Sequence, residues 1–596
     1  MRLRAPLLPA VRSFLSRHKR AASFVQRTLD RVPRLQDALL ERIREDPADA
    51  YRRWVATYDT LGAAELAAMR AAQGTVRDAP LLSLLSPADE ALKRSLSDQL
   101  FERWELRPLG SESAAAWNGA LESAASDHVV LVEPGVVLRP HALLLVAQAF
   151  ERDPDAVLVY ADEDEIDEHG VRSAHYFKPD WNPALLLAQN YLGGFVAFRR
   201  SQALAVGGFD DDLGGDRAWS LFLRLGADAA PSTIHHLPFV LSHRRVARRP
   251  DAADAERRRP VARAIAQRAG AEAEVEPVGE RSYRIDYSLP EKPPRVTVIV
   301  PSTGRPEILR PCLDGLLHRT DYPDFNVLLV VGRSADRTYL DELAARSEIR
   351  VLTHDDDSFN FSRLNNRAVD EAEAELLCFL NDDTEVIARE WLSRLVAHVL
   401  RDGVAAAGAM LLYPNGRIQH AGVVVGSGGV AAHNYARKPA DTPGYHDRAL
   451  VAQDVSCVTA ACMVVRRDVF LDIGRFDEAL ALAYNDIDLC LRLRAAGWRI
   501  VWTPSARLYH RESTSTGRHD ADEREEEWER ETSLMRSRWA RELNADPHYN
   551  PNLSLDPLYL WQPAFPPRIA LPWHAAAAEH AVAQTVGAPA RSSTRA

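Results

Sequence analysis

Carboxylates and amides follow directly on an apolar run in the second half of the chain. Asn381, Asp382 and Asp383 come after the run 376–380, whose length and composition predict a buried strand. Acidic oxygens at the end of a strand suit a hard divalent cation such as Mg²⁺ or Mn²⁺, which bridges the phosphates of a nucleotide. Asn and Asp also favour plain turns, because they hydrogen-bond to nearby backbone, so a capped turn is an alternative interpretation.

A second acidic cluster, Asn485, Asp486 and Asp488, opens a stretch with helical spacing that ends near Gly497. Asn485 is expected to cap this helix, and the helix N-terminus would then favour ionised carboxylates at both acids. An ionised aspartate that faces a cleft can act as general base toward a hydroxyl. The alternative is that both acids only complement the helix dipole.

These clusters need a scaffold that brings them together. Apolar runs typical of buried strands alternate with helical spacing at 296–300, 327–331, 349–352 and 376–380. Such alternation predicts a parallel sheet covered by helices on both faces. Ligands of these sheets bind at the carboxyl ends of the strands, where the polar clusters lie.

Several motifs of this region follow one another in a fixed order. They are Val296 to Thr303, Phe359 to Ser362 with Leu364 to Asn366, Phe379 to Val386, Gly416 to Gly422, Asn485 to Arg492 and Tyr509-His510. Together they resemble glycosyltransferase family 2, of the GT-A fold, in the branch that includes rhamnosyltransferase-like enzymes of bacterial surface polysaccharides. The resemblance covers about residues 294 to 520.

The resemblance implies a metal site and a catalytic base. Asp383 stands where the family has its metal ligand, and His510 matches a histidine that completes metal or diphosphate binding, with a satisfied core histidine as the alternative. Asp486 stands at the catalytic base and Asp488 at a supporting carboxylate. Asn381 replaces the first acid of the family motif, which changes its contact with the nucleotide or the metal.

The resemblance also implies a nucleotide pocket, and Gly332 stands where the family usually has an aspartate that contacts the base. The identity of the nucleobase is therefore left open. The residues expected to bind the nucleotide are Pro301, Thr303, Arg305, Asn366, Asn381 and Asp382.

The implied activity is an inverting, Mg²⁺- or Mn²⁺-dependent transfer of a hexosyl or rhamnosyl group. The donor would be a UDP-, dTDP- or GDP-linked sugar, and the acceptor a glycan or lipid-linked glycan. The alternative is a non-catalytic glycan-binding or assembly protein built on two degenerate domains, which the departures at Asn381 and Gly332 support.

The first half of the chain repeats the second. The anchors are Leu131 to Val136 with Phe379 to Thr384, Phe198 to Arg200 with Val465 to Arg467, Gly208 to Asp210 with Arg475 to Asp477, and Leu221 to Arg224 with Leu489 to Arg492. On this alignment Gly135, Ala218 and Ser220 replace the metal ligand, the base and its companion. We therefore expect a catalytically dead first copy. The acidic run 162–165 is expected to be a solvated loop, with a binding site as the alternative.

The fold class expected is α/β, with two GT-A (Rossmann-like) domains in tandem. A length of 596 residues exceeds what one core supports. A charged helix is expected at 523–542, with Trp528, Met535 and Trp539 buried. The expected divisions are a basic helical segment (1–75), a degenerate domain (76–250), a linker (251–293), the catalytic domain (294–545) and an extension disordered at its end (546–596).

Composition narrows the partners. The net charge of −11 argues against nucleic acid, and five cysteines without a CxxC pair favour a reducing cytoplasm over a secreted disulfide framework. No run is long enough for a spanning helix. Residues 1–35 are rich in arginine, so they would either lie on the inner face of the plasma membrane or form a solvated helix.

Overall fold

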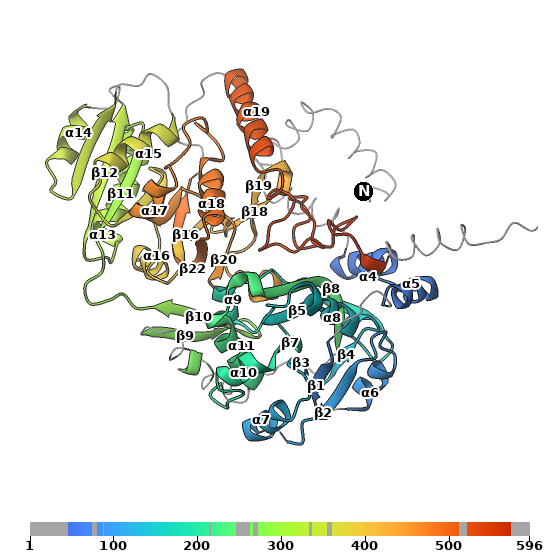
Figure 1. The fold of residues 1–596 in the computed structure, drawn as a ribbon. Coiled ribbons are helices and arrows are strands. Elements are labelled where there is room, and N and C mark those ends of the chain that lie inside the picture. Colours follow the sequence, from blue (N-terminus) through green and yellow to red (C-terminus); the bar gives the residue numbers. More distant parts are fainter. Residues whose placement is uncertain are drawn as a thin grey trace, which may run out of the picture. The chain divides into compact units, whose positions relative to one another are not determined.

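The computed structural model places the middle of the chain in helices and strands (Figure 1). The described residues are 46–73, 80–87, 89–111, 113–213, 216–245, 261, 263–265, 267, 272–332, 337–354, 360–511 and 521–573. The basic residues 1–35 and the tail beyond 573, which carry two of the expectations above, lie outside them. The chain divides into two compact units, 1–59 and 60–596, and the first includes α4 (Pro47–Tyr58).

A ten-stranded mixed sheet lies in the second half of the larger unit, with strand order β13-β12-β11-β14-β21-β16-β22-β15. Strands β11 to β14 pair in parallel, as predicted, but β21 runs antiparallel to β14, so the sheet is not purely parallel. The strands are β11 (Val296–Ser302), β12 (Phe325–Gly332), β13 (Ile349–His354), β14 (Leu376–Leu380), β15 (Thr384–Val386), β16 (Val404–Leu412), β17 (Ile418–His420), β20 (Gln453–Asp454), β21 (Cys462–Arg466) and β22 (Arg499–His510).

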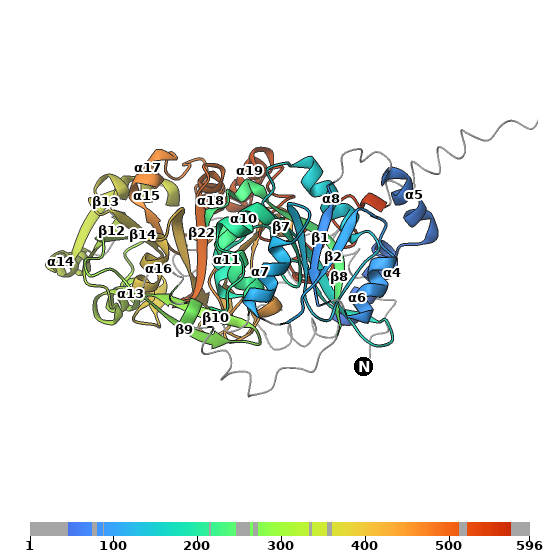
Figure 2. The ribbon, with the colours of Figure 1, turned by 60° about the horizontal axis from the view of Figure 1, so that its bottom comes forward.

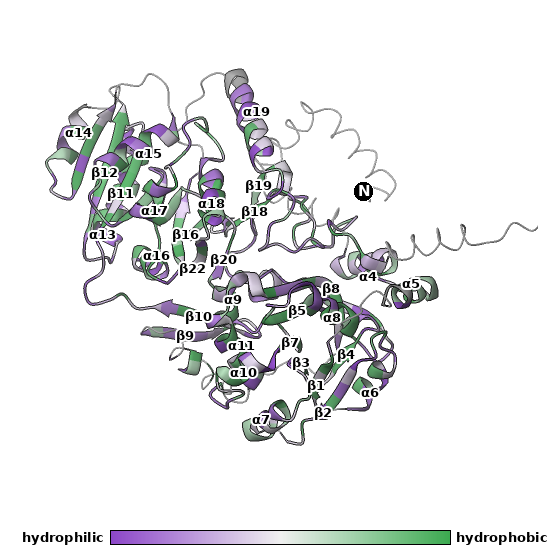
Figure 3. Ribbon diagram, viewed as in Figure 1, coloured by the Kyte–Doolittle hydropathy of each residue, from purple (hydrophilic) through white to green (hydrophobic). Residues whose placement is uncertain are grey.

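Helices cover both faces of this sheet (Figure 2). Alternate residues of β11 point to opposite sides, so that Ile299 packs in one core cluster while Val298 and Val300 pack in the other. The first cluster includes residues of α15 (Phe361–Asp370), α17 (Arg467–Asp472) and α18 (Asn485–Ala495), and the second those of α13 (Pro306–Arg319), α14 (Arg337–Ala344) and α16 (Trp391–Val399). Figure 3 shows β11 and β12 in the green of apolar residues, in keeping with this burial.

The first half of the unit holds an eight-stranded sheet of the same design. Its order, β2-β1-β3-β7-β5-β8-β4, matches β12-β11-β14-β21-β16-β22-β15 strand for strand, and every matched pair has the same parallel or antiparallel sense. A counterpart of β13 is absent from the described strands of this sheet. The strands are β1 (Leu82–Ser86), β2 (Trp104–Pro108), β3 (His128–Val132), β4 (Val136–Leu138), β5 (Leu158–Ile166), β6 (Arg172–Tyr176), β7 (Phe195–Arg199) and β8 (Ile234–Arg245).

The helices of the first half are short, and all but α5 accompany the eight-stranded sheet in the chain. They are α5 (Ala63–Gln73), α6 (Glu90–Ser97), α7 (Ala114–Glu122), α8 (Ala142–Arg152), α9 (Pro183–Ala188), α10 (Arg200–Ala205) and α11 (Arg217–Asp228).

The acidic run 162–165 is not a solvated loop. It lies on β5, and Asp162 and Asp164 are buried. Asp162 accepts hydrogen bonds from Asn550 Nδ2 and Asn552 Nδ2 of the C-terminal segment, while Asp164 pairs with Arg172 and His243. The sequence argument failed here because the partners of these acids come from the paired strands β6 and β8 and from the C-terminal segment, and the sequence alone does not show that pairing.

Two further predictions need correction. The segment predicted to be a linker contains a β-hairpin, β9 (Ala273–Val278) with β10 (Ser282–Tyr287), whose contacts with α9 and α16 tie it to the folded unit. The charged helix forms as α19 (Ala521–Arg538), but only Met535 of the three expected residues is fully buried. Trp528 is 49% exposed.

All five cysteines are buried and none forms a disulfide. Among the described residues, no helix is both long and apolar enough to cross a membrane.

Candidate active site

The carboxyl ends of β11 and β14 lie next to each other, because these strands pair in parallel. Pro301 and Ser302 close β11, and Ser302 Oγ donates a 2.6 Å hydrogen bond to Asp382 Oδ2 just beyond β14. Asp382 is buried. The hydrogen bond between Ser302 and Asp382 therefore joins the carboxyl ends of β11 and β14.

Asp383 meets His510 across the edge of the sheet. β15 pairs antiparallel with β22, which places Thr384 opposite His510, and Asp383 O accepts a hydrogen bond from Arg511 N. The side chains meet as well, with Asp383 Oδ1 3.1 Å from His510 Nε2, and both residues are buried. The structure thus brings together the two residues expected to hold a metal.

Gln419 of β17 determines which nitrogen of His510 faces Asp383. His510 Nδ1 lies 2.7 Å from Gln419 Oε1, which can only accept, so Nδ1 carries the proton and donates. His510 Nε2 faces Asp383 Oδ1 at 3.1 Å, and Asn381 Nδ2 lies 3.2 Å from the same nitrogen. A hydrogen bond from Nε2–H or a cation shared by the two atoms would stabilise this contact.

These residues fit a divalent cation. A carboxylate oxygen and an imidazole nitrogen suit Mn²⁺ or Mg²⁺, and a ligating histidine commonly donates its other N–H to a carbonyl, as His510 does to Gln419. Within the described part of the chain no group of three or more His, Cys, Asp or Glu side chains forms a metal site. The remaining ligands would have to come from a phosphate group or water.

Asp486 lies in the first turn of α18 and is partly buried. Its Oδ2 accepts a hydrogen bond from Ala460 N, while the next residue, Ala461, accepts one from Asn381 N through its carbonyl oxygen. The dipeptide Ala460-Ala461 thus hydrogen-bonds both to Asp486 and to the turn that carries Asp383. The predicted base and the turn that carries the predicted metal ligand therefore contact the same dipeptide.

The expected helix cap was wrong. Tyr484, not Asn485, is the cap of α18, in the left-handed region with φ 59° and ψ 4°. Asn485 is the first helical residue, and its Oδ1 accepts from Asp486 N. Polar residues are preferred at such caps, so the position was assigned one residue too late.

Asp488 does not face a cleft. It is 0% exposed, and its oxygens bind Arg492 Nε at 2.8 Å, Arg538 Nη1 at 2.7 Å and Trp539 Nε1 at 3.0 Å. A carboxylate with these partners cannot reach a substrate. Asp488 is a supporting residue that ties α18 to α19.

Asn366 does not line a nucleotide pocket. Its Nδ2 donates to Phe476 O at 2.9 Å and to Glu478 Oε1 at 3.2 Å, and its Oδ1 accepts from Phe476 N. These bonds fix the segment before α18. Of the other predicted nucleotide contacts, Thr303 is exposed after β11, and Arg305 Nε donates to Thr303 Oγ1.

The equivalent place in the eight-stranded sheet has different chemistry. Arg244 pairs with Val136 as His510 pairs with Thr384, and Glu133 N donates to Gly194 O as Asn381 N does to Ala461 O. The Arg244 guanidinium lies 3.6 Å from Glu133, whose pKa is raised to about 7 by burial. Arg244 and Glu133 thus face each other near the place that corresponds to His510 and Asp383.

The equivalent helix, α11, has no acidic residue in its first turn. The residues of α11 that match Asp486 and Asp488 are Ala218 and Ser220, and Ser220 Oγ donates to Asp210. Neither side chain can act as a carboxylate base.

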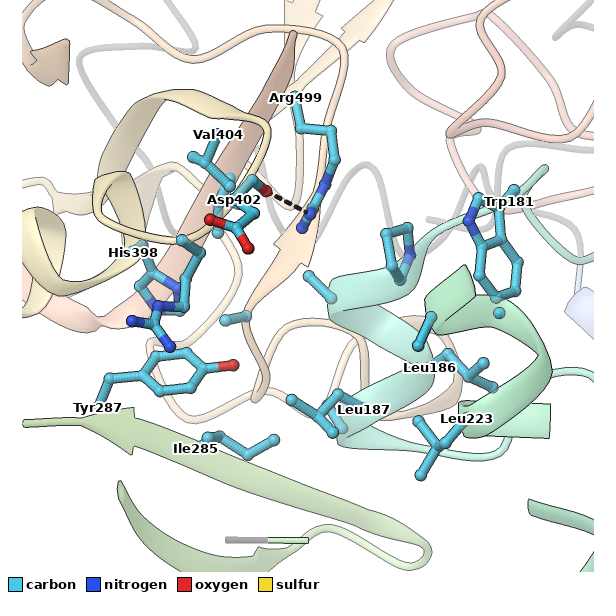
Figure 4. Close-up of a pocket in the computed structure, with 18 of the residues that line it drawn as sticks. Trp181, Leu186, Leu187, Leu223, Ile285, Tyr287, His398, Asp402, Val404 and Arg499 are labelled. Carbon is cyan, nitrogen blue, oxygen red and sulfur yellow. Dashed lines mark hydrogen bonds between the residues drawn. The ribbon is translucent and has the colours of Figure 1, made fainter. Parts of the chain in front are cut away.

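A separate cavity of about 420 Å³ lies near the other end of β22 (Figure 4). Trp181, Tyr287, Arg401 and Arg499 are among the residues that line it. Arg499 begins β22 and His510 ends it, so the cavity lies at the opposite end of this strand from His510 and Asp383. It is not part of this site.

The sequence did not single out Gln419, the residue that contacts His510 Nδ1. It lies inside the motif Gly416 to Gly422, but that pattern does not say that β17 pairs with β16, the strand that also pairs with the end of β22.

Residues 293–537 match the family described as glycosyltransferase like family 2. An uncharacterized protein, y4gI, of Sinorhizobium fredii is 39% identical over 465 residues, which are 76% of this chain and 51% of that protein. The O-antigen biosynthesis protein RfbC of Myxococcus xanthus is 36% identical over 557 residues, 85% of this chain and 42% of RfbC. The chain spans about half the length of these curated relatives.

A shorter match lies with the N-acetylglucosaminyl-diphospho-decaprenol L-rhamnosyltransferase of Mycobacterium tuberculosis, which is 33% identical over 111 residues. They cover 18% of this chain and 36% of that enzyme. The family match includes β11, Asp383, Asp486 and His510, the elements from which the site is built. Residues 293–537 of this chain are therefore a glycosyltransferase family 2 domain.

Proposed function

We propose that the chain is an inverting, metal-dependent glycosyltransferase that acts on bacterial surface polysaccharide. The observation that carries the proposal is the pairing of Asp383 with His510 at the strand ends, joined through Ala460-Ala461 to Asp486. Such a site can hold a nucleotide diphosphate by its phosphates and offer a base to a hydroxyl.

Asp383 and His510 would hold the cation, which when bound neutralises charge on the departing diphosphate. Asp486 would accept the proton of an acceptor hydroxyl as its oxygen attacks the anomeric carbon. The bond from that carbon to the diphosphate breaks as the bond to the acceptor forms, so a single displacement inverts the configuration. Exclusion of water by the site protects the donor from hydrolysis.

The relatives support the substrate class. One is named as an O-antigen biosynthesis protein and another as a rhamnosyltransferase that uses a diphospho-lipid sugar. We infer a nucleotide-linked hexose or rhamnose as donor, with UDP, dTDP or GDP, and a glycan or lipid-linked glycan as acceptor. With such an acceptor, we infer that the enzyme acts in the cytoplasm, at the inner face of the plasma membrane.

We also propose that the eight-stranded sheet is a second GT-A domain that has lost its chemistry. Its matching strand order supports a common design, and its Glu133–Arg244 pair and Ala218 support the loss of metal and base. This domain would support the active one or hold the acceptor glycan.

A thermal-shift screen tests the proposal. UDP-, dTDP- and GDP-linked sugars are added with Mn²⁺ or Mg²⁺, and one donor class is expected to raise the melting temperature of the wild-type chain. The Asp383→Ala variant should lose this shift, while Asp314→Ala, at an exposed position of α13, should keep it.

A non-catalytic assembly protein would give a different result. If no nucleotide sugar stabilises the chain and no metal-dependent release of nucleotide diphosphate is detected, the glycosyltransferase proposal is wrong. The degenerate-domain alternative would then stand.

A further inference from the structure

Helix α19 carries a buried carboxylate on an otherwise charged and exposed helix. Glu531 is 0% exposed, although most of its neighbours in 525–530 are exposed. Burial raises the pKa of Glu531. Because burying an ionisable group is costly without compensating hydrogen bonds, its partners indicate why it is there.

The partners of Glu531 are three successive backbone N–H groups. Ala481 N and Leu482 N donate to its Oε1 at 2.6 and 3.1 Å, and Ala483 N donates to its Oε2 at 2.7 Å. These residues lead directly into the left-handed Tyr484 and the first turn of α18. Consecutive N–H groups that converge in this way form a concave anion-binding nest, and Glu531 fills it.

The C-terminal end of the same helix also contacts residues on the other side of Asp486 in the chain. Near its end, Arg538 Nη1 and Trp539 Nε1 bind Asp488 Oδ1, and Arg538 Nη2 binds Asp477 Oδ2 at 2.7 Å. Glu531 and Arg538 are seven residues apart, which places them on one face of the helix about two turns apart. One face of α19 therefore contacts the chain both before and after Asp486.

We propose that α19 is a positioning clamp for Asp486, with Glu531 and Arg538 as its two contact points. This inference rests on the proposed function, because it takes Asp486 as the base. The backbone contacts of Glu531 end three residues before Asp486, and Arg538 and Trp539 hold a side chain two residues after it. The clamp sets the direction of the Asp486 carboxylate without touching the substrate.

The physical consequence concerns the rate rather than donor binding. Asp383 and His510 are held by β15 and β22, whose pairing does not involve α19. Loss of the clamp should leave the metal and nucleotide in place while the base samples other directions. A small displacement of a base is enough to slow proton transfer strongly.

The test compares Glu531→Gln with a matched control, Glu526→Gln, which changes an exposed glutamate of the same helix. In Glu531→Gln an NH₂ group replaces one carboxylate oxygen. This NH₂ group faces a backbone N–H that donated a hydrogen bond to that oxygen in the wild type. Hydrogen–deuterium exchange of the peptides containing Ala481 to Ala483 should become at least about tenfold faster. With the donor identified by thermal shift, kcat should fall at least about tenfold while the donor KM stays within about twofold.

A second variant guards against misfolding. Trp539→Phe keeps an aromatic side chain, although a smaller one, and removes the N–H that binds Asp488. It should lower kcat in the same direction with the donor KM unchanged. Glu531→Asp, which keeps the charge, should recover more activity than Glu531→Gln.

Each readout can overturn the inference separately. Unchanged exchange at 481–483 in Glu531→Gln would show that the clamp does not hold the loop. Faster exchange with an unchanged kcat, or an equal loss in Glu526→Gln, would show that the clamp does not position the base. A wild-type chain that transfers no sugar would instead contradict the proposed function, and the exchange result would still decide whether the clamp exists.

Discussion

Asp383 and His510 are distant in sequence, yet their side-chain atoms lie 3.1 Å apart. The order of the motifs predicted both as metal ligands. The motifs could not predict the contact of Gln419 with His510. This contact depends on the pairing of β17 and of β22 with the same strand, β16. The motifs also could not show that Asn366 uses its amide on the backbone of Phe476.

Gln419 should tune the affinity of the metal site. In Gln419→Leu, His510 loses the acceptor that holds its Nδ1 proton and ring orientation. Loss of such an outer partner typically weakens metal binding by about 10- to 100-fold. Calorimetric titration with Mn²⁺ in the presence of the stabilising nucleotide sugar measures this, and Gln202→Leu, at an exposed position of α10, is the control. Equal Mn²⁺ affinity in wild type and Gln419→Leu would contradict the assignment of His510 as a ligand.

At the scale of elements, one cluster joins the eight-stranded sheet to the C-terminal segment. Asn550 Nδ2 donates to both oxygens of Asp162 and to Lys178 O, and His236 Nε2 donates to Asp162 Oδ1 at 2.8 Å. His236 Nδ1 donates to Asp180 Oδ1. Since both ring nitrogens donate, His236 is an imidazolium in this cluster.

This cluster predicts a pH dependence of stability. Burial acts to lower the pKa of His236, but the charge of Asp162 and the hydrogen bonds to Asp162 and Asp180 outweigh it and raise the pKa to about 9. The protonated form is thus favoured in the folded state. Its contribution, on the order of 3 kcal/mol, is fully present below the unfolded pKa of about 6.5 and is lost as the pH rises toward 9.

Thermal unfolding of wild type and His236→Gln between pH 6 and pH 9.5 measures this contribution. The difference in melting temperature between the two should be largest near pH 6 and should shrink as the pH approaches 9. A difference that stays constant over this range would show that the protonation of His236 is not linked to folding.

The N-cap of α18 could not be predicted from local sequence preference alone. Asn485 has the chemistry of a cap, yet Tyr484 takes the position with a positive φ. The loop before it is held by Glu531 of α19, a contact that local preference does not contain. The strands and helices around the site were predictable because their hydrophobic periods are regular. The β9–β10 hairpin also alternates apolar and polar residues, as in Tyr283, Arg284 and Ile285, so the same rule could have found its strands.

At the scale of the whole chain, the motif anchors predicted a repeat, and the two sheets have the same strand order. The anchors could not show which side chains meet in the first sheet at the place that corresponds to Asp383 and His510. Glu133 and Arg244 meet there, and their contact depends on the pairing of β4 with β8.

The first sheet should not contribute to the chemical step. In Glu133→Gln a carboxyl whose pKa is already raised to about 7 becomes permanently neutral. We expect kcat and the metal requirement of transfer to stay within about twofold of wild type, measured by release of nucleotide diphosphate at several Mn²⁺ concentrations. A loss as large as that of Asp383→Ala would show that the first sheet takes part in catalysis.

Replacement of Asp486 by asparagine tests the central claim most directly. Asparagine keeps the size of the side chain and an oxygen that can accept from Ala460 N, but it cannot take a proton, and its NH₂ group replaces the oxygen that accepts from Ile487 N. Transfer to the acceptor should fall at least about 100-fold, as expected for loss of a general base, while the chain stays folded and keeps its thermal shift with nucleotide sugar and Mn²⁺. Transfer at the wild-type rate by the folded Asp486→Asn chain would contradict the account.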